Sequence, residues 1–274
     1  MKKESNVLSG VVTTTGRPSE QMVKRANDIA VKWKLPFIER NKKSIQKMIE
    51  QWNTTIFIVR TSGIEAHHRC GDQPFFFHPN AAMFRAKRLY RYGDDPIVSI
   101  CNVEEGDVVV DATLGLGSDA QLASLATGEK GKVIGLESSP IVAHIVSEGL
   151  STYESSFQPL NEAMRRIEVL HVNHLTWFQS QQTNSVDIVY FDPMFETEVE
   201  KSHGFDPIRH ISSAQSLSLE VINEAKRIAR KRVILKDHFK SLRFKTLGFH
   251  VDVRRSATYQ FGIIDLEKSE NNEK

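Results

Sequence analysis

The chain has few cysteines, no long apolar run and almost no excess of charge. Its two cysteines, Cys70 and Cys101, are too few for a disulfide framework, which argues against a disulfide-stapled secreted domain. No apolar stretch approaches the roughly 18 residues that a membrane span needs. Residues 1–6 lead into no apolar segment, so we expect no secretory signal, no membrane partner and a cytoplasmic location.

A formal net charge of +2 over 274 residues neither demands nor excludes a nucleic-acid partner. The length is sufficient for one large domain and a smaller one. We expect a small α/β domain at residues 1–75, a bridging helical segment at 76–105, a main domain at 106–266 and a disordered tail at 267–274.

Residues 10–75 predict a small α/β module. Ser19 and Ser44 each precede an apolar pattern of helical period, and their hydroxyls can cap the helices that follow. The resulting order is β-α-β-α-β. The expected strands are 11–15, 36–38 and 54–59, and the expected helices are 20–34 and 45–52.

The bridge that follows, residues 60–96, carries unusual polar chemistry. His67, His68 and Cys70 lie close together, as metal ligands often do. Adjacent histidines point in different directions in any regular element, however, and no second cluster completes a tetrahedral site. We therefore expect no metal here, but a polar loop or a ligand-facing surface.

Residues 81–92 predict a basic helix directly before the main domain. Its cations either form a solvated face or line the entrance of a binding site. We expect His78, Arg85 and Arg88 to contact substrate. The cations of this helix are Arg85, Lys87, Arg88 and Arg91.

From residue 106 onward, strand and helix patterns alternate, which predicts a parallel, doubly wound α/β sheet. The last two strands, 250–254 and 259–265, are joined by a short turn and form an antiparallel hairpin. This arrangement is the class I methyltransferase layout, whereas a dinucleotide-binding domain finishes its sheet in parallel. The remaining expected strands are 107–111, 132–137, 167–172, 185–191 and 231–236, and the helices are 118–127, 139–150, 174–180 and 211–229.

The first strand of this domain ends at Asp111 and runs into a turn containing Gly115 and Gly117. Such a turn brings backbone N–H groups close to a nucleotide-like ligand, either a dinucleotide or S-adenosylmethionine (AdoMet). An acid before the glycines would repel a pyrophosphate but suits the amino-acid end of AdoMet. We therefore expect Asp111, Thr113, Gly115 and Gly117 to bind AdoMet, with a purely structural turn as the alternative.

The next two strand ends also carry polar side chains. Glu137 can accept hydrogen bonds from both ribose hydroxyls, or it can cap the helix that begins near Pro140. Asn173 can hydrogen-bond the adenine of the cofactor, or it can cap the helix that follows it. We expect Glu137 and Asn173 to bind the cofactor.

The fourth strand runs into Asp192-Pro-Met-Phe195, which resembles the Asp-Pro-Pro-Tyr/Phe motif of methyltransferases that act on exocyclic base amines. Asp192 and the Pro193 carbonyl would accept the N–H bonds of the amine, and Phe195 would stack on the base. The alternative is a turn that merely ends the strand. At the end of the fifth strand, Lys236 would contact a phosphate or the base, unless it is a surface lysine.

Three stretches together resemble the RsmJ family, AdoMet-dependent guanine-N2 methyltransferases of small-subunit ribosomal RNA. The resemblance covers roughly residues 105–240, and the methionine within Asp192-Pro-Met-Phe195 is its most specific part. It implies an RNA partner, either rRNA or the small ribosomal subunit. Residues 77–92 are more similar to the YpiP-like proteins, a separate branch of related methyltransferases. The three stretches are residues 111–120, 189–195 and 232–236.

The sequence departs from the RsmJ pattern at Ser118, Glu196 and Asp237, and each departure lowers the positive charge near the site. Three functions therefore stay open. The first is methylation of a guanine or adenine amine in RNA. The others are methylation of a small-molecule or protein amine by the same fold, and a non-catalytic module that binds AdoMet or RNA.

Overall fold

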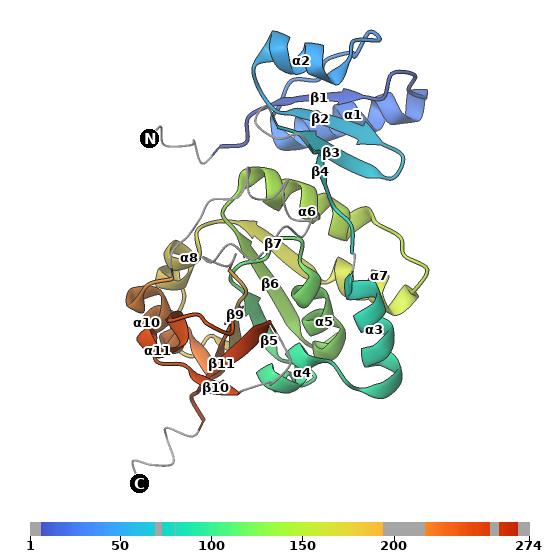
Figure 1. Ribbon diagram of the computed structural model, residues 1–274. Helices are drawn as coiled ribbons and strands as arrows, with labels where there is room; N and C mark the ends of the chain where they lie inside the picture. Colours follow the sequence, from blue (N-terminus) through green and yellow to red (C-terminus); the bar gives the residue numbers. More distant parts are fainter. Residues whose placement is uncertain (1–6, 69–72, 80, 194–216, 253–257, 268–274) are drawn as a thin grey trace. The chain divides into compact units, whose positions relative to one another are not determined.

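The computed structural model describes residues 7–68, 73–79, 81–193, 217–252 and 258–267. Within them the chain forms two compact units (Figure 1). The first unit contains the described residues up to His78 together with 138–154, and the second contains the others. The domain boundaries expected at residues 75, 105 and 266 stay predictions.

The first unit is built on a four-stranded sheet of order β1-β2-β3-β4. Strand β1 runs parallel to β2, and the other neighbours are antiparallel. Because side chains alternate along a strand, Ile56 and Ile58 pack with Met48 of α2, whereas Phe57 meets Trp33 of α1 with ring centroids 5.3 Å apart. The elements are β1 (Val11–Thr14), α1 (Glu20–Trp33), α2 (Ile45–Trp52), β2 (Ile56–Arg60), β3 (Gly63–His67), β4 (Phe75–Phe76) and α6 (Pro140–Thr152), which packs against β3.

Two expectations for this unit are wrong. The strand expected at 36–38 is a single parallel bridge between Phe37 and Val12. Strand β3 was not expected, because its buried residues, Ile64 and Ala66, alternate with polar ones over only five positions.

The histidines of the expected polar bridge lie at the end of β3. The Nε2 atom of His67 lies 3.1 Å from a carboxylate oxygen of Glu65, the residue two positions earlier on the same strand. Within the described ranges, no group of three or more histidine, cysteine, aspartate or glutamate side chains could hold a metal ion. Cys70 lies outside those ranges.

The second unit contains a seven-stranded sheet of order β10-β11-β9-β8-β5-β6-β7. Strands β5 to β9 run parallel, and β11 pairs antiparallel with both β9 and β10. This arrangement confirms the predicted parallel sheet closed by a hairpin. The strands are β5 (Val108–Asp111), β6 (Lys132–Glu137), β7 (Ile167–His171), β8 (Val186–Phe191), β9 (Ala229–His238), β10 (His250–Asp252) and β11 (Tyr259–Asp265).

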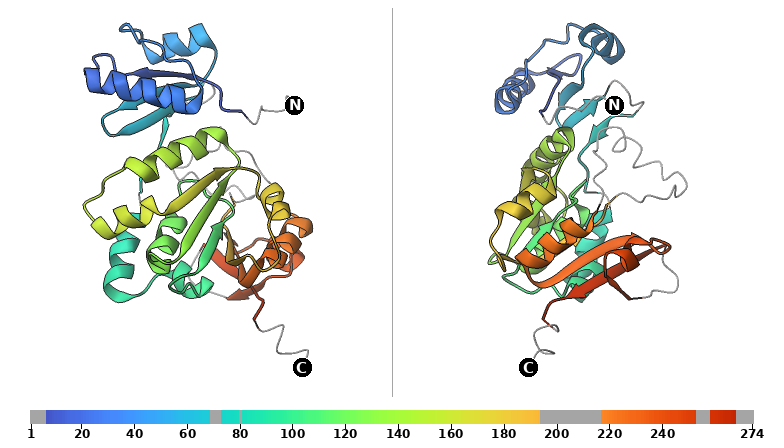
Figure 2. Two further views of the ribbon diagram at one scale, coloured as in Figure 1. Left: turned by 180° about the vertical axis from the view of Figure 1, so that it is seen from behind. Right: turned by 90° about the vertical axis from the view of Figure 1, so that its left-hand side faces the viewer.

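Helices cover both faces of this sheet (Figures 1 and 2). On one face, α8 (His174–Ser180), α10 (Leu219–Ile228) and α11 (Arg243–Thr246) bury a core with the strands. On the other lies α5 (Ser118–Thr127), against which three further helices pack. These are α3 (Ala81–Tyr92), α4 (Pro96–Cys101) and α7 (Gln158–Arg165).

Helix α4 lies within the bridging helical segment expected at 76–105, but its bounds were not predicted, and α7 and α11 were not expected from the sequence. These three helices contain only six, eight and four residues, too few for an apolar helical period to stand out. Among the helices described, none has the length and apolar character that a bilayer crossing requires.

Strand β5 lies between β6 and β8, so the strand order reverses on either side of it. Open α/β sheets bind ligands outside the carboxyl ends of their strands at such a switch point. Four predicted site residues gather at this edge. Asp111, Glu137, Asp192 and Lys236 lie at or next to the ends of β5, β6, β8 and β9.

Candidate active site

The turn after β5 is tight and open to a ligand. The Gly117 N–H donates to the Leu114 carbonyl over 2.7 Å, which closes the turn just before α5 begins. Gly115 and Gly117 have φ angles of +50° and +70°, a region that strains residues with a side chain. Among the described residues, a Cβ atom at Gly115 would come no closer than 3.9 Å to an atom outside its chain neighbours, so these residues leave space at the turn.

Asp111 presents a buried carboxyl group beneath this turn. Asp111 is only 4% exposed, and its Oδ1 atom accepts the Thr113 N–H over 3.2 Å. Burial, reinforced by the negative charge of Asp119, raises the pKa of Asp111 to about 8. Because it forms no ion pair with a described cation, a cationic ligand group would favour its ionised form.

Glu137 ends β6 and is also buried. One of its carboxylate oxygens accepts the Gly115 N–H over 3.1 Å, so the acid is joined to the glycine turn. The alternative that Glu137 caps the following helix is wrong, because the Ser139 side chain accepts the Val142 N–H at the start of α6.

Asn173 caps the helix that follows β7. Its Oδ1 atom accepts the N–H groups of Leu175 and Thr176 over 2.9 and 3.2 Å, which confirms the capping alternative. Contact between Asn173 and adenine stays a prediction. Because Oδ1 is engaged in capping, the side-chain nitrogen would make that contact.

Asp192 follows β8 and is held at two points. Its backbone N–H donates to the Thr113 hydroxyl over 2.6 Å, and its Oδ2 atom accepts a hydrogen bond from Lys236 over 2.7 Å. Burial raises the pKa of Asp192 and Lys236 opposes this, which leaves it at about 6. In the part of the chain that the structure describes, no donor reaches Oδ1. Pro193 is buried, and Phe195 lies outside the described residues.

An additional acid, Asp119, joins these elements. It lies in the first turn of α5, where Oδ1 accepts from Arg85 over 2.6 Å. Its Oδ2 atom accepts from the Tyr190 hydroxyl over 2.7 Å and from Lys236 over 3.2 Å. Burial alone would raise the pKa of Asp119, but Lys236 and Arg85 outweigh it and hold it at about 2.

The sequence reasoning missed Asp119 and Tyr190. Asp119 lies in the expected helix 118–127 and Tyr190 in the expected strand 185–191, but neither was predicted to be a site residue. A usable signal was present, since an acid in the first turn of this helix reaches the same sheet edge as Lys236.

Two of the residues expected to contact substrate are engaged inside the second unit. The Lys236 side chain is only 18% exposed, so the alternative of a surface lysine is wrong. Arg85 makes two hydrogen bonds to the carboxylate of Asp95, over 2.8 and 2.9 Å, besides its bond to Asp119. This geometry favours a positioning role for Arg85 over the expected substrate contact.

The other two residues expected to contact substrate are exposed. Arg88 pairs with the exposed Asp94. His78 lies edge-on to the Tyr153 ring within the first unit, with centroids 5.8 Å apart. Their contact with substrate stays a prediction.

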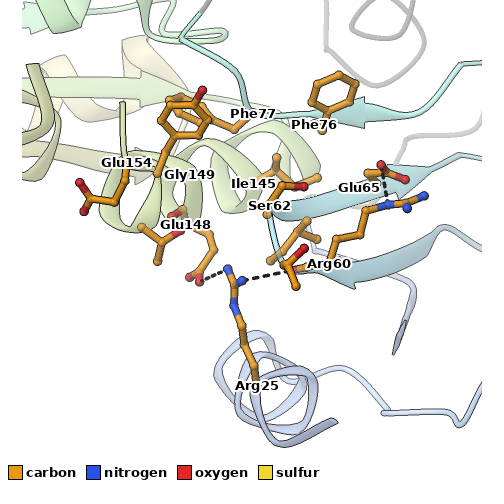
Figure 3. Close-up of a pocket in the computed structure, with 15 residues that line it drawn as sticks. Arg25, Arg60, Ser62, Glu65, Phe76, Phe77, Ile145, Glu148, Gly149 and Glu154 are labelled. Carbon is orange, nitrogen blue, oxygen red and sulfur yellow. Dashed lines mark hydrogen bonds and ion pairs between the residues drawn. The ribbon is translucent and has the colours of Figure 1, made fainter. Parts of the chain in front are cut away.

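The first unit contains a separate pocket of about 550 Å³, which no predicted site residue lines (Figure 3). Arg25 points from α1 toward Glu148 of α6 over 3.6 Å and donates to the Arg60 carbonyl over 3.1 Å. Arg60 pairs with Glu65 over 2.6 Å. Both arginines that line the pocket are therefore paired with acids that also line it.

The edge of the second sheet suits AdoMet. A buried carboxyl group with a raised pKa, that of Asp111, matches an ammonium group, and the Glu137 carboxylate matches a pair of hydroxyls. Both acids border the glycine turn, because Glu137 accepts the Gly115 N–H and Asp111 accepts the Thr113 N–H.

Comparisons with known proteins agree with this fit. The family described as "Putative SAM-dependent methyltransferase" matches residues 45–251. The uncharacterised protein YpiP of Bacillus subtilis is 41% identical over 93% of this chain and 98% of its own length. Ribosomal RNA small subunit methyltransferase J of Actinobacillus succinogenes is 33% identical, over 48% of this chain and about half, 51%, of its own length.

A solved structure extends the comparison to the whole fold. The crystal structure of a SAM-dependent methyltransferase from Neisseria gonorrhoeae superposes with a TM-score of 0.61 at 16% identity. The superposition covers 97% of this chain and 99% of that one, so the two share a fold across both units.

Proposed function

The chain belongs to this family of SAM-dependent methyltransferases, and we propose that it methylates an exocyclic base amine in RNA, specifically guanine N2 of ribosomal RNA. The observation that carries the proposal is the state of Asp192. One carboxylate oxygen is held by Lys236, and no described donor reaches the other. That second oxygen suits the N–H of an incoming amine.

The cofactor, AdoMet, supplies an electrophilic methyl group when bound. We propose that Asp111 accepts its amino group and that Glu137 accepts its ribose hydroxyls. Gly115 and Gly117 would provide backbone clearance, and Thr113 would line the turn. The support is the burial of both acids and the open space at Gly115.

An exocyclic amine is a poor nucleophile because its lone pair is delocalised into the ring. Accepting its N–H bonds on Asp192 and on the Pro193 carbonyl would localise the lone pair toward the methyl group. With a pKa of about 6, Asp192 is mostly ionised at neutral pH and can accept these bonds. Methylation leaves the nitrogen positively charged and therefore acidic, so it gives up a proton to Asp192 or to water without needing a strong base.

RNA is supported as the substrate by the relatives named ribosomal RNA small subunit methyltransferase J, although they match only half of this chain. We propose that the protein acts in the cytoplasm on rRNA or on the small ribosomal subunit.

The test is transfer of labelled methyl from AdoMet to RNA isolated from a strain lacking this protein, followed by mapping of the modified base. We expect label at guanine N2. Label at an adenine amine would change the base but keep the chemistry. Label only in protein or small molecules would contradict an RNA substrate, and no transfer to any acceptor would favour a binding module.

The pKa of Asp111 predicts that AdoMet binding depends on pH. At pH 7 a carboxyl group with a pKa of about 8 is mostly protonated, and an ammonium ligand favours its ionised form. Binding should therefore release close to one proton, and affinity should rise by up to about tenfold per pH unit toward pH 8, where the ligand's own amino group begins to lose charge. Calorimetry in two buffers of different ionisation enthalpy measures the released proton.

The control for this measurement is Asp111→Asn, in which both the proton release and the pH dependence should vanish. If the unsubstituted protein binds AdoMet with the same affinity at every pH and releases no proton, Asp111 does not face the amino group.

A further inference from the structure

The outer face of α3 combines cations with an exposed aromatic ring. Phe84, Lys87, Arg88 and Arg91 are spaced three, four and seven residues apart, so they share one face of the helix. All four are exposed, and Phe84 is 73% exposed. The opposite face buries Ala82, Ala86 and Leu89.

This face belongs to a helix that reaches the candidate active site. Arg85, the residue next to Phe84, donates to Asp119, and Asp119 accepts from Lys236. Lys236 in turn holds Asp192. Three side chains, Arg85, Asp119 and Lys236, thus connect the backbone of α3 with the proposed amine acceptor, and all of them lie in the second unit.

The charges of this face are largely uncompensated. Helix α3 contains no acidic residue. Arg88 pairs with Asp94, but an ion pair between exposed side chains contributes little and is readily exchanged. Lys87 and Arg91 have no acidic partner among the described residues. The face therefore complements a polyanion.

Aromatic rings stand at both ends of this row of cations. Phe84 lies in the first turns of α3, and Tyr92, which is 70% exposed, ends the helix with the Arg91 guanidinium 5.9 Å from its ring centroid. Proteins that bind single-stranded nucleic acid use this combination, because cations follow the phosphates and aromatic rings stack on the bases.

We propose that the face formed by Phe84, Lys87, Arg88, Arg91 and Tyr92 binds the single-stranded RNA segment that flanks the methylated nucleotide. The cations contact its phosphates, and Phe84 and Tyr92 stack on its bases. This inference rests on the proposed RNA substrate and adds the surface that positions it.

The cations are tested with the double variant Lys87→Gln/Arg91→Gln. The KM for RNA should rise, and the slope of log affinity against log salt should become shallower by about 1.4, since each lost phosphate contact removes about 0.7 for a single strand. The value of kcat at saturating RNA and the affinity for AdoMet should not change. The matched control is Lys130→Gln/Lys226→Gln, which removes the same charge near the amino ends of β6 and β9.

The aromatic residues are tested separately with Phe84→Ala. Loss of one stacked base should raise the KM for RNA roughly tenfold and leave the salt slope unchanged. Because Phe84 is exposed, the variant should fold normally. The two kinds of variant thus separate phosphate contact from base stacking.

Each outcome decides the proposal. If the unsubstituted protein methylates RNA and both variants keep its KM and salt slope, α3 is not the docking face, while the proposed function stands. A shift in the cation variant alone would overturn single-strand docking in favour of duplex backbone contact. An effect seen only on intact ribosomal subunits would indicate a protein contact instead. If no RNA is methylated at all, the proposed function itself fails.

Discussion

Replacing Asp192 with alanine should abolish methyl transfer while AdoMet affinity stays within about tenfold, or roughly 1.4 kcal/mol. The variant removes the proposed acceptor for the amine N–H. It leaves Glu137 bound to the glycine turn and Asp111 beneath it. Single-turnover kinetics measures the transfer, and calorimetric titration measures the affinity for AdoMet.

The matched control is Asp187→Ala, at the opposite end of the same strand. Asp187 pairs with Arg230 and accepts the Val108 N–H, so its loss should lower stability. The folded fraction of that variant should nevertheless keep its activity. Full activity of Asp192→Ala would mean that Asp192 does not accept the amine.

The second large effect is expected for Asp119→Asn. Two cations, Arg85 and Lys236, share this buried carboxylate, and breaking a buried ion pair typically costs about 3–5 kcal/mol. Both cations keep a second acid, Asp95 or Asp192, so we expect a loss near the lower limit, about 3 kcal/mol, in the free energy of unfolding at pH 7. Urea denaturation measures it.

The difference in the free energy of unfolding between the unsubstituted protein and Asp119→Asn should depend on pH. The pKa of Asp119 is lowered to about 2 in the folded protein, below its value of about 4 in an unfolded chain. Its ionised form therefore stabilises the fold above about pH 4, and this contribution is lost as the pH falls toward 2. The stabilities of the two proteins should converge over that range.

A control for Asp119→Asn is Glu104→Gln. Glu104 is an exposed acid, and its partner Lys231 keeps a second acid, Asp107, so the loss should be about 1 kcal/mol or less. Equal losses for the two variants would show that Asp119 is not the shared counter-ion of a buried network.

Short stretches of sequence were enough to predict where the parallel strands end. Asp111, Glu137 and Asp192 each end a short β-branched or apolar run, and parallel connections bring such ends to one edge. The capping role of Asn173 was likewise predictable as an alternative, because it depends only on the next three residues.

The ion-pair network was not predictable in the same way. Its members, Arg85, Asp119, Tyr190 and Lys236, come from four elements, and which side chain meets which depends on how α3 and α5 pack on the sheet. Sequence spacing can place Asp119 and Lys236 at the same sheet edge, but it does not say which side chains pair there. Arg85 was consequently expected to face RNA, whereas its guanidinium turns inward.

The hydrogen bond of 2.6 Å between the Thr113 hydroxyl and the Asp192 backbone has a consequence for alignment. Reacting groups must be held to within about half an ångström. If Thr113 and Asp192 moved independently, the variations in their two positions would add, and the distance between cofactor and amine would vary by the sum. Because the hydrogen bond joins the two residues directly, they move together, and the distance between the cofactor turn and the amine acceptor varies less.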